Sequence, residues 1–200
     1  MWALVEDGSI TKIINKPRGM VIDNIQYSRN IFSFRWSNAE REAIGIYEIV
    51  FNNTNKKDEA YYTNTNQSFA FADGVVTASY GSATAKAHAD ANATDADGND
   101  LDPVVVIPGL KTKKIEIVKA QAAGILQDTD WYIVRKADAD TSVPSAITNH
   151  RAAVRTKCAE METAITNASN TAAIKTLYTY TEQEDGSVTR PLGNLPTLEV

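Results

Sequence analysis

The chain contains 200 residues, of which 43% are hydrophobic and 22% are charged, a composition typical of one large folded domain or two small ones and not of a disordered chain. Its formal net charge of −5 argues against a protein that binds duplex nucleic acid, because such a protein needs a concentrated basic face. The single cysteine, Cys158, excludes an internal disulfide, and the sequence predicts neither a signal peptide nor a membrane span. We therefore expect no nucleic-acid partner and no membrane partner.

The first 81 residues are predicted to form a β-rich domain. Two Asp-Gly pairs, at residues 7–8 and 73–74, lie between apolar runs, which is a strong signal for a β-hairpin. A polar loop is expected at residues 52–58. The strands expected in this half cover residues 3–5, 10–14, 20–22, 46–51, 59–63, 68–72 and 75–80.

One short helix interrupts these strands. Ser37 followed three residues later by Glu40 fits the capping box, in which each side chain bonds the other residue's backbone amide. Gly45 is expected to end this helix, because glycine readily adopts the backbone conformation that follows a last turn. The expected core of this half is aromatic and consists of Trp2, Phe32, Phe34, Trp36, Tyr47 and Phe51.

Residues 82–103 differ in composition, because small and polar residues dominate there. We expect a linker, or a loop ordered by packing on a neighbour. The aspartates in this stretch are a weak calcium candidate, since calcium binds several hard oxygens in a tight turn. The EF-hand pattern is not met, because Gly98 comes too early and the distant glutamate is missing. The candidate ligands are Asp95, Asp97, Asn99 and Asp102, and the alternative is a solvated acidic turn.

Residues 104–200 are predicted to form a mainly helical domain. An amphipathic helix is expected at residues 113–126, a strand at 131–134, and a long helix from Pro144 to about residue 168, because proline fits the first helical turn. A shorter helix at 171–180 and a hairpin-like turn at 184–187 follow. The apolar face of the first of these helices comprises Ile115, Val118, Ala122, Ile125 and Leu126. The whole chain is therefore predicted to be α+β.

The long helix carries apolar residues at heptad-like spacing, interrupted by Arg151. Such a seam predicts either a coiled-coil contact with another copy or partner, or burial against the protein's own sheet. The seam residues are Ile147, Val154, Cys158, Met161 and Ile165.

No catalytic constellation is recognisable. The two histidines, His88 and His150, have neither the surroundings of a catalytic triad nor the spacing of metal ligands. A phosphate-binding loop and a dinucleotide fingerprint are also missing. Cys158 lies on the apolar seam, where cysteine behaves as a small hydrophobic residue. We therefore expect a protein that is not an enzyme and needs no cofactor.

Two parts of the chain resemble proteins of tailed bacteriophages. The segments DTDWYIVRKADA (residues 128–139) and VPSAITNHRAAVR (residues 143–155) resemble a run found in tail and tail-fibre-associated proteins. The segments MWALVEDGSITKI (residues 1–13) and WSNAEREAIGIYEIV (residues 36–50), together with the region of Tyr61 and Tyr62, are similar to the opening of hypothetical virion-associated proteins of marine phages.

This resemblance implies a structural protein of the tail, baseplate or fibre that acts by binding other virion proteins. It implies synthesis in the bacterial cytoplasm, a place in the virion, and a homotrimer if the chain belongs to a fibre. An alternative is a chaperone of tail-fibre assembly, and a third reading is a carbohydrate-binding receptor module. The aromatic residues that could stack on sugars are Tyr61, Tyr62, Tyr178 and Tyr180.

Overall fold

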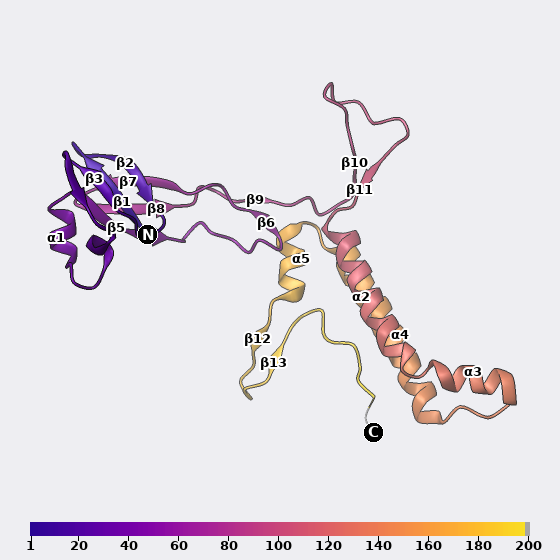
Figure 1. Cartoon of the computed structure of the whole chain (residues 1–200). Helices are drawn as coiled ribbons and strands as arrows, with labels where there is room; N and C mark the ends of the chain where they lie inside the picture. The colour runs from indigo at the N-terminus through magenta and orange to yellow at the C-terminus, as the bar shows by residue number, and fades with distance from the viewer. Residues whose placement is uncertain (199–200) are drawn as a thin grey trace. The chain divides into compact units, whose positions relative to one another are not determined.

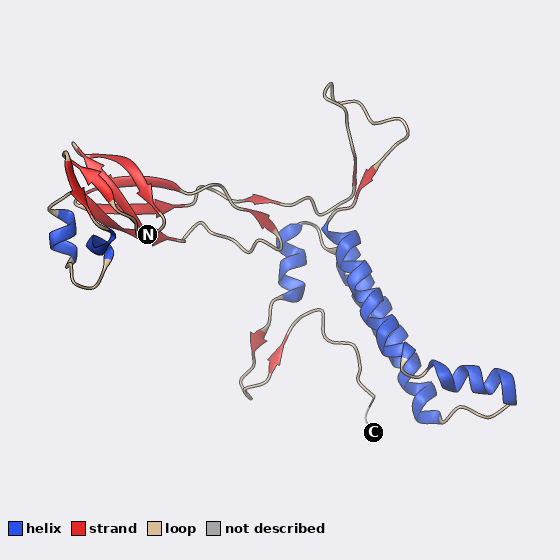
Figure 2. Cartoon of the chain, in the orientation of Figure 1, coloured by secondary structure: helices blue, strands red, loops and turns tan. Residues whose placement is uncertain are grey.

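The computed structural model describes residues 1–198 and is α+β, as the sequence predicts. The chain forms two compact units, Met1–Thr84 and Ala85–Val200. Strands dominate the first unit and helices the second (Figures 1 and 2). The first unit ends three residues beyond the domain expected at residues 1–81, and residues 85–103, most of the expected linker or loop, fall within the second unit.

A five-stranded sheet forms the first unit, in the order β2-β1-β5-β8-β7. Neighbouring strands are antiparallel except β5 and β8, which are parallel. The edge strands β2 and β7 contact each other, so the sheet is curled. The strands are β1 (Trp2–Glu6), β2 (Ser9–Ile14), β5 (Ile46–Asn52), β7 (Ser68–Ala72) and β8 (Val75–Ser79).

The two Asp-Gly turns form as predicted. Asp7 and Gly8 have φ angles of 50° and 74°, and Asp73 and Gly74 have φ angles of 50° and 75°. Positive φ at both central residues matches the twist of the flanking strands. The turns therefore join β1 to β2 and β7 to β8 as antiparallel hairpins, and the pairing of β1 with β2 shifts register between Leu4 and Val5.

Smaller elements complete this unit: the hairpin of β3 (Met20–Ile22) and β4 (Ile25–Tyr27), the 3-10 helix η1 (Arg29–Phe32), α1 (Asn38–Glu42) and β6 (Tyr62–Thr63). β9 (Thr84–Ala85) lies at the unit boundary. The strand expected at residues 59–63 is reduced to β6. Asp58 is the reason, because its carboxylate accepts a hydrogen bond from the Ala60 N–H (2.8 Å) and its carbonyl accepts one from the Tyr61 N–H (3.1 Å), which makes a turn.

The predicted capping box of α1 is present. Ser37 Oγ accepts a hydrogen bond from the Glu40 N–H (3.2 Å), and Glu40 Oε2 accepts one from the Ser37 N–H (2.7 Å). Gly45 follows the helix with φ of 81°, and a Cβ at this position would lie 2.6 Å from the Val5 carbonyl oxygen. Glycine is therefore required here for both its conformation and its size.

Two apolar clusters lie on the two faces of the sheet. Leu4 and Ile46 belong to one cluster, and Ala3, Val5 and Ile49 belong to the other, because successive residues of a strand point to opposite faces. Four of the six aromatic residues predicted for the core pack against these clusters: Trp2, Phe32, Trp36 and Tyr47.

The prediction is wrong for Phe34 and Phe51, which are 95% and 45% exposed. Phe34 lies in the turn between η1 and α1, and Phe51 lies near the end of β5, where the strand is exposed on both faces. Hydrophobicity alone does not indicate which apolar residues lie beyond the covered part of a sheet.

Four helices dominate the second unit. α2 and α4 pack along each other, and Val118, Met161, Ile165 and Leu192 form a buried cluster with them. α2 begins three residues before its predicted start, and α4 follows Pro144 as predicted. Within residues 1–198, no helix is long and apolar enough to cross a membrane. The helices are α2 (Leu110–Gln127), α3 (Asp130–Ala139), α4 (Ser145–Asn167) and α5 (Thr171–Tyr178).

Two short hairpins complete the second unit. β10 (Ala91–Asn92) pairs with β11 (Val106–Ile107), and β12 (Thr181–Glu182) pairs with β13 (Val188–Thr189) around the predicted turn at residues 184–187. The chain then returns to the helices, where Leu192 is 2% exposed and its N–H donates to the Leu177 carbonyl (3.0 Å).

The strand predicted at residues 131–134 is wrong, because these residues lie in α3. Aromatic and β-branched residues favour strands, but only weakly against context. Here the run is preceded by Asp130 at the helix start and followed by Arg135 and Lys136, and both placements favour a helix. Arg151 of α4 additionally holds Asp130 in place (2.8 Å).

Candidate functional site

The predicted seam of α4 lies inside the second unit. Ile147, Val154, Met161 and Ile165 are 7%, 0%, 1% and 0% exposed, and Cys158 is partly exposed. α4 packs on α2 of the same chain, so a helix of the same unit lies beside this face. Heptad spacing predicts that a helix packs here, but it does not indicate whether that helix belongs to the same chain.

Cys158 does not have the surroundings of a reactive thiol. Its Sγ donates to Glu162 Oε1 (3.5 Å), and Glu162 also pairs with Lys119 (3.0 Å). Burial raises the pKa of the Cys158 thiol, and the hydrogen bond and the negative charge of Glu162 raise it further. The thiolate, which is the nucleophilic form, is therefore disfavoured at neutral pH.

The residues proposed as calcium ligands form a turn in which a carboxylate oxygen accepts hydrogen bonds from N–H groups of the same turn. Asp95 Oδ1 accepts hydrogen bonds from the N–H groups of Asp97 and Asn99 (2.9 Å each). The Asn99 N–H, followed by the Asn99 side chain, lowers the pKa of Asp95. The carboxylate of Asp100 accepts from the Asn92 amide (2.7 Å). Within residues 1–198, no three His, Cys, Asp or Glu side chains are grouped closely enough to hold a metal ion, and Asp102 does not complete such a group with Asp95 and Asp97.

This turn is the tip of an extended hairpin formed by residues 91–107, which we call the arm. β10 and β11 pair at its base, and farther out the Ala93 N–H donates to the Val105 carbonyl (2.7 Å). The arm follows directly on Asp90 and leads into α2 (Figure 1).

Asp90 fixes the arm to the start of α2. Its carboxylate accepts hydrogen bonds from the Gly109 N–H (2.8 Å) and the Thr112 hydroxyl (2.7 Å). The Gly109 N–H is the main cause of the lowered pKa of Asp90. Gly109 is the N-cap residue of α2 and has no side chain to serve as a cap, so Asp90 supplies the acceptor that a helix start needs.

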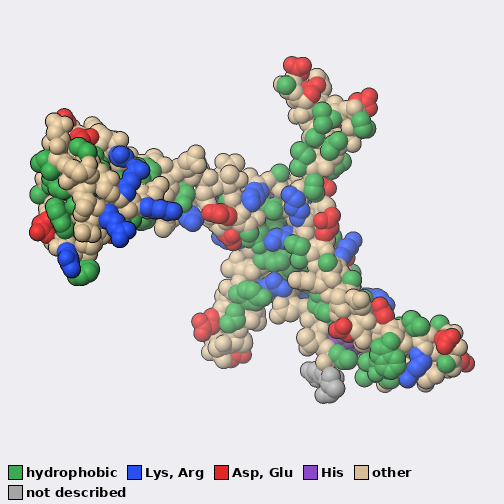
Figure 3. All heavy atoms as spheres, in the orientation of Figure 1, with side chains coloured by type: hydrophobic (Ala, Val, Ile, Leu, Met, Phe, Trp, Pro, Cys, Tyr) green, Lys and Arg blue, Asp and Glu red, His purple; other side chains and the backbone are tan. Residues whose placement is uncertain are grey.

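The arm exposes aliphatic side chains over its whole second strand. Because successive side chains of an extended backbone alternate, hydrophobic groups lie on both of its faces. Residues 91–107 also contain four aspartates and no lysine or arginine. Figure 3 shows the hydrophobic side chains along the arm and the acidic ones toward its far end. The exposed residues are Val104 (59%), Val105 (49%), Val106 (55%) and Ile107 (54%).

A second exposed apolar region lies on α3, none of whose ten residues is buried. Trp131 and Val134, 51% and 66% exposed, are three residues apart and share one side of the helix. The rings of Trp131 and Tyr132 are 3.8 Å apart between centroids, and the Arg135 guanidinium lies 4.7 Å above the Trp131 ring. We call these four residues the α3 surface.

Arg151 attaches α3 to the body of the unit. It is 6% exposed, its Nη1 donates to the Leu126 carbonyl (2.7 Å) and Thr129 Oγ1 (2.6 Å), and its Nη2 pairs with Asp130 (2.8 Å). The residue that interrupts the heptad pattern of α4 is therefore the one that positions α3. The preceding residue of α4, His150, is also buried, at 8% exposure.

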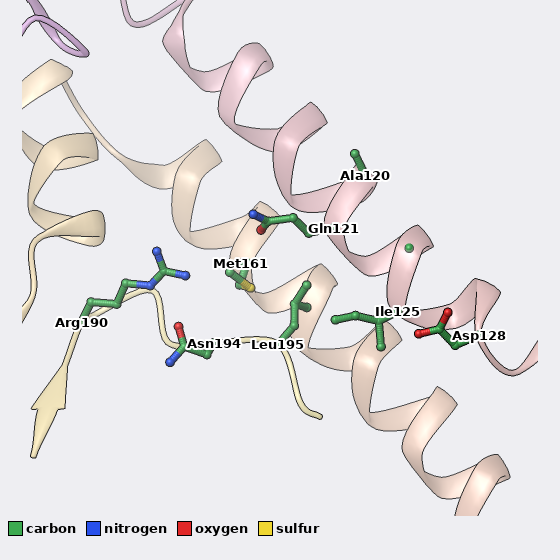
Figure 4. Close-up of a pocket in the computed structure, with 9 residues that line it drawn as sticks. Ala120, Gln121, Ile125, Asp128, Met161, Arg190, Asn194 and Leu195 are labelled. Atoms are coloured by element: carbon green, nitrogen blue, oxygen red, sulfur yellow. The ribbon is translucent and has the colours of Figure 1, made fainter. Parts of the chain in front are cut away.

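A shallow cavity of about 480 Å³ lies between α2, α4 and the returning C-terminal segment (Figure 4). Met161 lies at its inner side, and Asp128 and Arg190 are the charged residues of its lining. The Arg190 Nε donates to the Gly193 carbonyl (2.9 Å), and its guanidinium lies over the ring of Tyr180. This lining contains no histidine, cysteine or serine and so offers no nucleophile and base pair.

The tyrosines proposed for sugar stacking are divided between the two units, Tyr61 and Tyr62 in the first and Tyr178 and Tyr180 in the second. Tyr61 is 5% exposed, Lys57 lies 4.8 Å above the ring of Tyr62, and Lys114 lies 4.6 Å above that of Tyr178. Tyr180 is 55% exposed. Of these four tyrosines, Tyr180 is therefore the most exposed ring.

Comparison with protein-family models, with curated proteins and with solved structures finds no match to this chain. The arm and the α3 surface were not predicted from the sequence. For the arm, the run of four aliphatic residues at 104–107 indicates a strand, but such a run does not distinguish a buried strand from an exposed one.

Proposed function

We propose that this chain is a structural component of a tailed-phage particle that acts through contacts with other proteins. The observation that carries the proposal is the exposed hydrophobic surface of the arm and of α3. The resemblance of residues 128–139 and 143–155 to tail-associated proteins supports the same conclusion. The alternative from the same resemblance is a chaperone that binds a fibre protein during assembly.

The amount of exposed surface supports a role in contacts. The chain exposes 13160 Å², whereas two separate compact units of these sizes would expose about 11,000 Å². An excess of about 2,000 Å² is comparable to the whole area buried in a standard protein interface. Burying this extra surface against other proteins in an assembly would offset the free-energy cost of leaving it exposed to water.

The free energy of a contact through the arm can be estimated from the hydrophobic effect. The side chains at 104–107 are each about half exposed, so burying the remainder would contribute about 4 kcal/mol in total. α3 supports the same reasoning, because a helix of ten residues is marginal in water without tertiary packing. A partner that covers Trp131 and Val134 would supply that packing.

The proposal is tested by quantitative mass spectrometry of gradient-purified particles of the phage that encodes the chain. Peptides of the chain at a fixed ratio to the portal protein are expected, and the ratio would distinguish a fibre trimer from a ring component. If the chain is abundant in the infected-cell lysate but missing from the particles, the virion role is wrong and the assembly chaperone is favoured.

A further inference from the structure

We infer that the arm of one copy binds the α3 surface of a second copy, so that copies associate head to tail. The inference deepens the proposed function and rests on it, because it names one partner for the same exposed surfaces. Its support is the placement and the chemistry of the two surfaces within the second unit.

The two surfaces lie at opposite ends of α2. Asp90 and Gly109 hold the base of the arm at the first turn of this helix, and Arg151 holds α3 beside its last turn through the Leu126 carbonyl. α2 has 18 residues and is therefore about 27 Å long. One copy thus presents its arm and its α3 surface as two separate sites, each available to a different neighbour.

The chemistry of the surfaces is complementary. The arm offers aliphatic side chains and four aspartates with no basic residue. The α3 surface offers the indole of Trp131 and the side chain of Val134, with the guanidinium of Arg135 stacked beside them. Trp, Tyr and Arg are the residues most enriched at the energetic centres of interfaces. A guanidinium stacked on a ring still presents its edge to a carboxylate.

Charge also favours this pairing over the symmetric ones. Asp130 is paired with Arg151, and the other charged residues of α3 and its C-cap are Arg135, Lys136, Asp138 and Asp140, so α3 is neutral whereas the arm is acidic. Two arms side by side would bring eight aspartates together, and two α3 surfaces would oppose Arg135 to its own copy. Like charges across an interface suppress such arrangements.

A contact between two different surfaces is heterologous. Such a contact builds a ring when its rotation closes and an open chain when it does not. Both outcomes suit a component of a tail, baseplate or fibre. Four of the five seam residues of α4 are buried inside each copy and Cys158 is partly exposed, so the seam is not part of the contact inferred here.

The test is sedimentation velocity of the full chain and of two variants over a wide range of concentration. Val105→Asp disables the arm, and Val134→Asp disables the α3 surface. Both residues are exposed, so the fold should be unchanged by circular dichroism. Val188→Asp is the matched control, because Val188 is 58% exposed and lies in β13, outside both surfaces. Wild type and control should associate, and each test variant alone should associate at least tenfold more weakly.

The decisive sample is an equimolar mixture of the two test variants. One partner retains an intact α3 surface and the other an intact arm, so head-to-tail binding predicts a heterodimer and no larger species. A wild type that stays monomeric, or a mixture that does not dimerise, overturns the inference. Neither result bears on whether the chain is found in particles, so failure of the inference is distinguishable from failure of the proposed function.

Discussion

Arg151 should be the residue on which the position of α3 depends, and Arg151→Met is the change that tests this. Methionine keeps most of the side-chain volume but removes the guanidinium. The two bonds from Nη1, to the Leu126 carbonyl (2.7 Å) and to Thr129 Oγ1 (2.6 Å), are then lost. The ion pair with Asp130 is lost as well.

The expected loss of stability follows from these contacts. Each charge-assisted hydrogen bond contributes about 1.5 kcal/mol. The loss is smaller than the sum of these bonds, because the Thr129 hydroxyl also donates to the Leu126 carbonyl (3.0 Å). Thr129 Oγ1 and the Leu126 carbonyl oxygen therefore each keep one hydrogen-bond partner in the variant. The Arg151 Nε has no hydrogen-bond partner among the described residues, so its removal relieves a small penalty. We therefore expect a net loss of about 2 kcal/mol in the free energy of unfolding of the second unit.

Asp130→Asn is the control. The Asp130 side chain is 56% exposed, so solvent screens its ion pair, and the expected loss is about 0.5 kcal/mol. Urea denaturation followed by the helical signal in circular dichroism measures both variants. Amide exchange of residues 130–139 should also become faster in Arg151→Met. The reasoning is refuted if Arg151→Met is as stable as wild type, or if Asp130→Asn destabilises the protein as much as Arg151→Met does.

Three further outcomes are expected. Ser37→Ala should lower the stability of the first unit by about 1 kcal/mol through loss of the cap, measured by thermal unfolding, and an unchanged Tm would contradict the role of the capping box. Met161→Ala should destabilise the second unit by about 3 kcal/mol, whereas Val134→Asp on the exposed side of α3 should change stability by less than about 0.5 kcal/mol; equal losses in denaturant titrations would be inconsistent with the assigned burial. Since burial and Glu162 raise the pKa of the Cys158 thiol, its alkylation should be slower than that of a free thiol at pH 8 and should accelerate as the pH rises through the raised pKa. Glu162→Gln should speed the alkylation, and a wild-type rate equal to that of a free thiol would contradict the raised pKa.

The features that the sequence predicts well are local ones. The Asp-Gly turns and the pair of Ser37 and Glu40 act over two to four residues, so the residue types and their spacing are sufficient to specify them. Pro144 likewise places the start of α4. The α+β class follows from the sum of such local signals.

The features that the sequence does not predict depend on distant partners. Asp90 caps α2 from 19 positions before Gly109, and Arg151 anchors α3 through Thr129, 22 positions away. Neither spacing corresponds to a repeating pattern. The strand predicted at residues 131–134 fails for this reason, because β propensity is weaker than the tertiary contacts that hold Asp130.

For the apolar surfaces, too, the sequence does not indicate which part of the protein, if any, covers them. The spacing of Val154 and Met161 correctly indicates a helix-packing face, but the partner is α2 of the same chain. Exposure of residues 104–107 could not be read from their hydrophobicity, which equally suits a buried strand. Their exposure becomes evident only from the structure, in which these four residues are each about half exposed.

If the chain acts through these contacts, the arm and the α3 surface should become covered by protein in the assembled particle. Hydroxyl-radical footprinting, comparing the dilute free chain with the chain in purified particles, tests it most directly. Oxidation of Trp131 and of residues 104–107, all exposed in the free chain, should fall several-fold in the particle. Equal oxidation of these residues in both samples would contradict the claim.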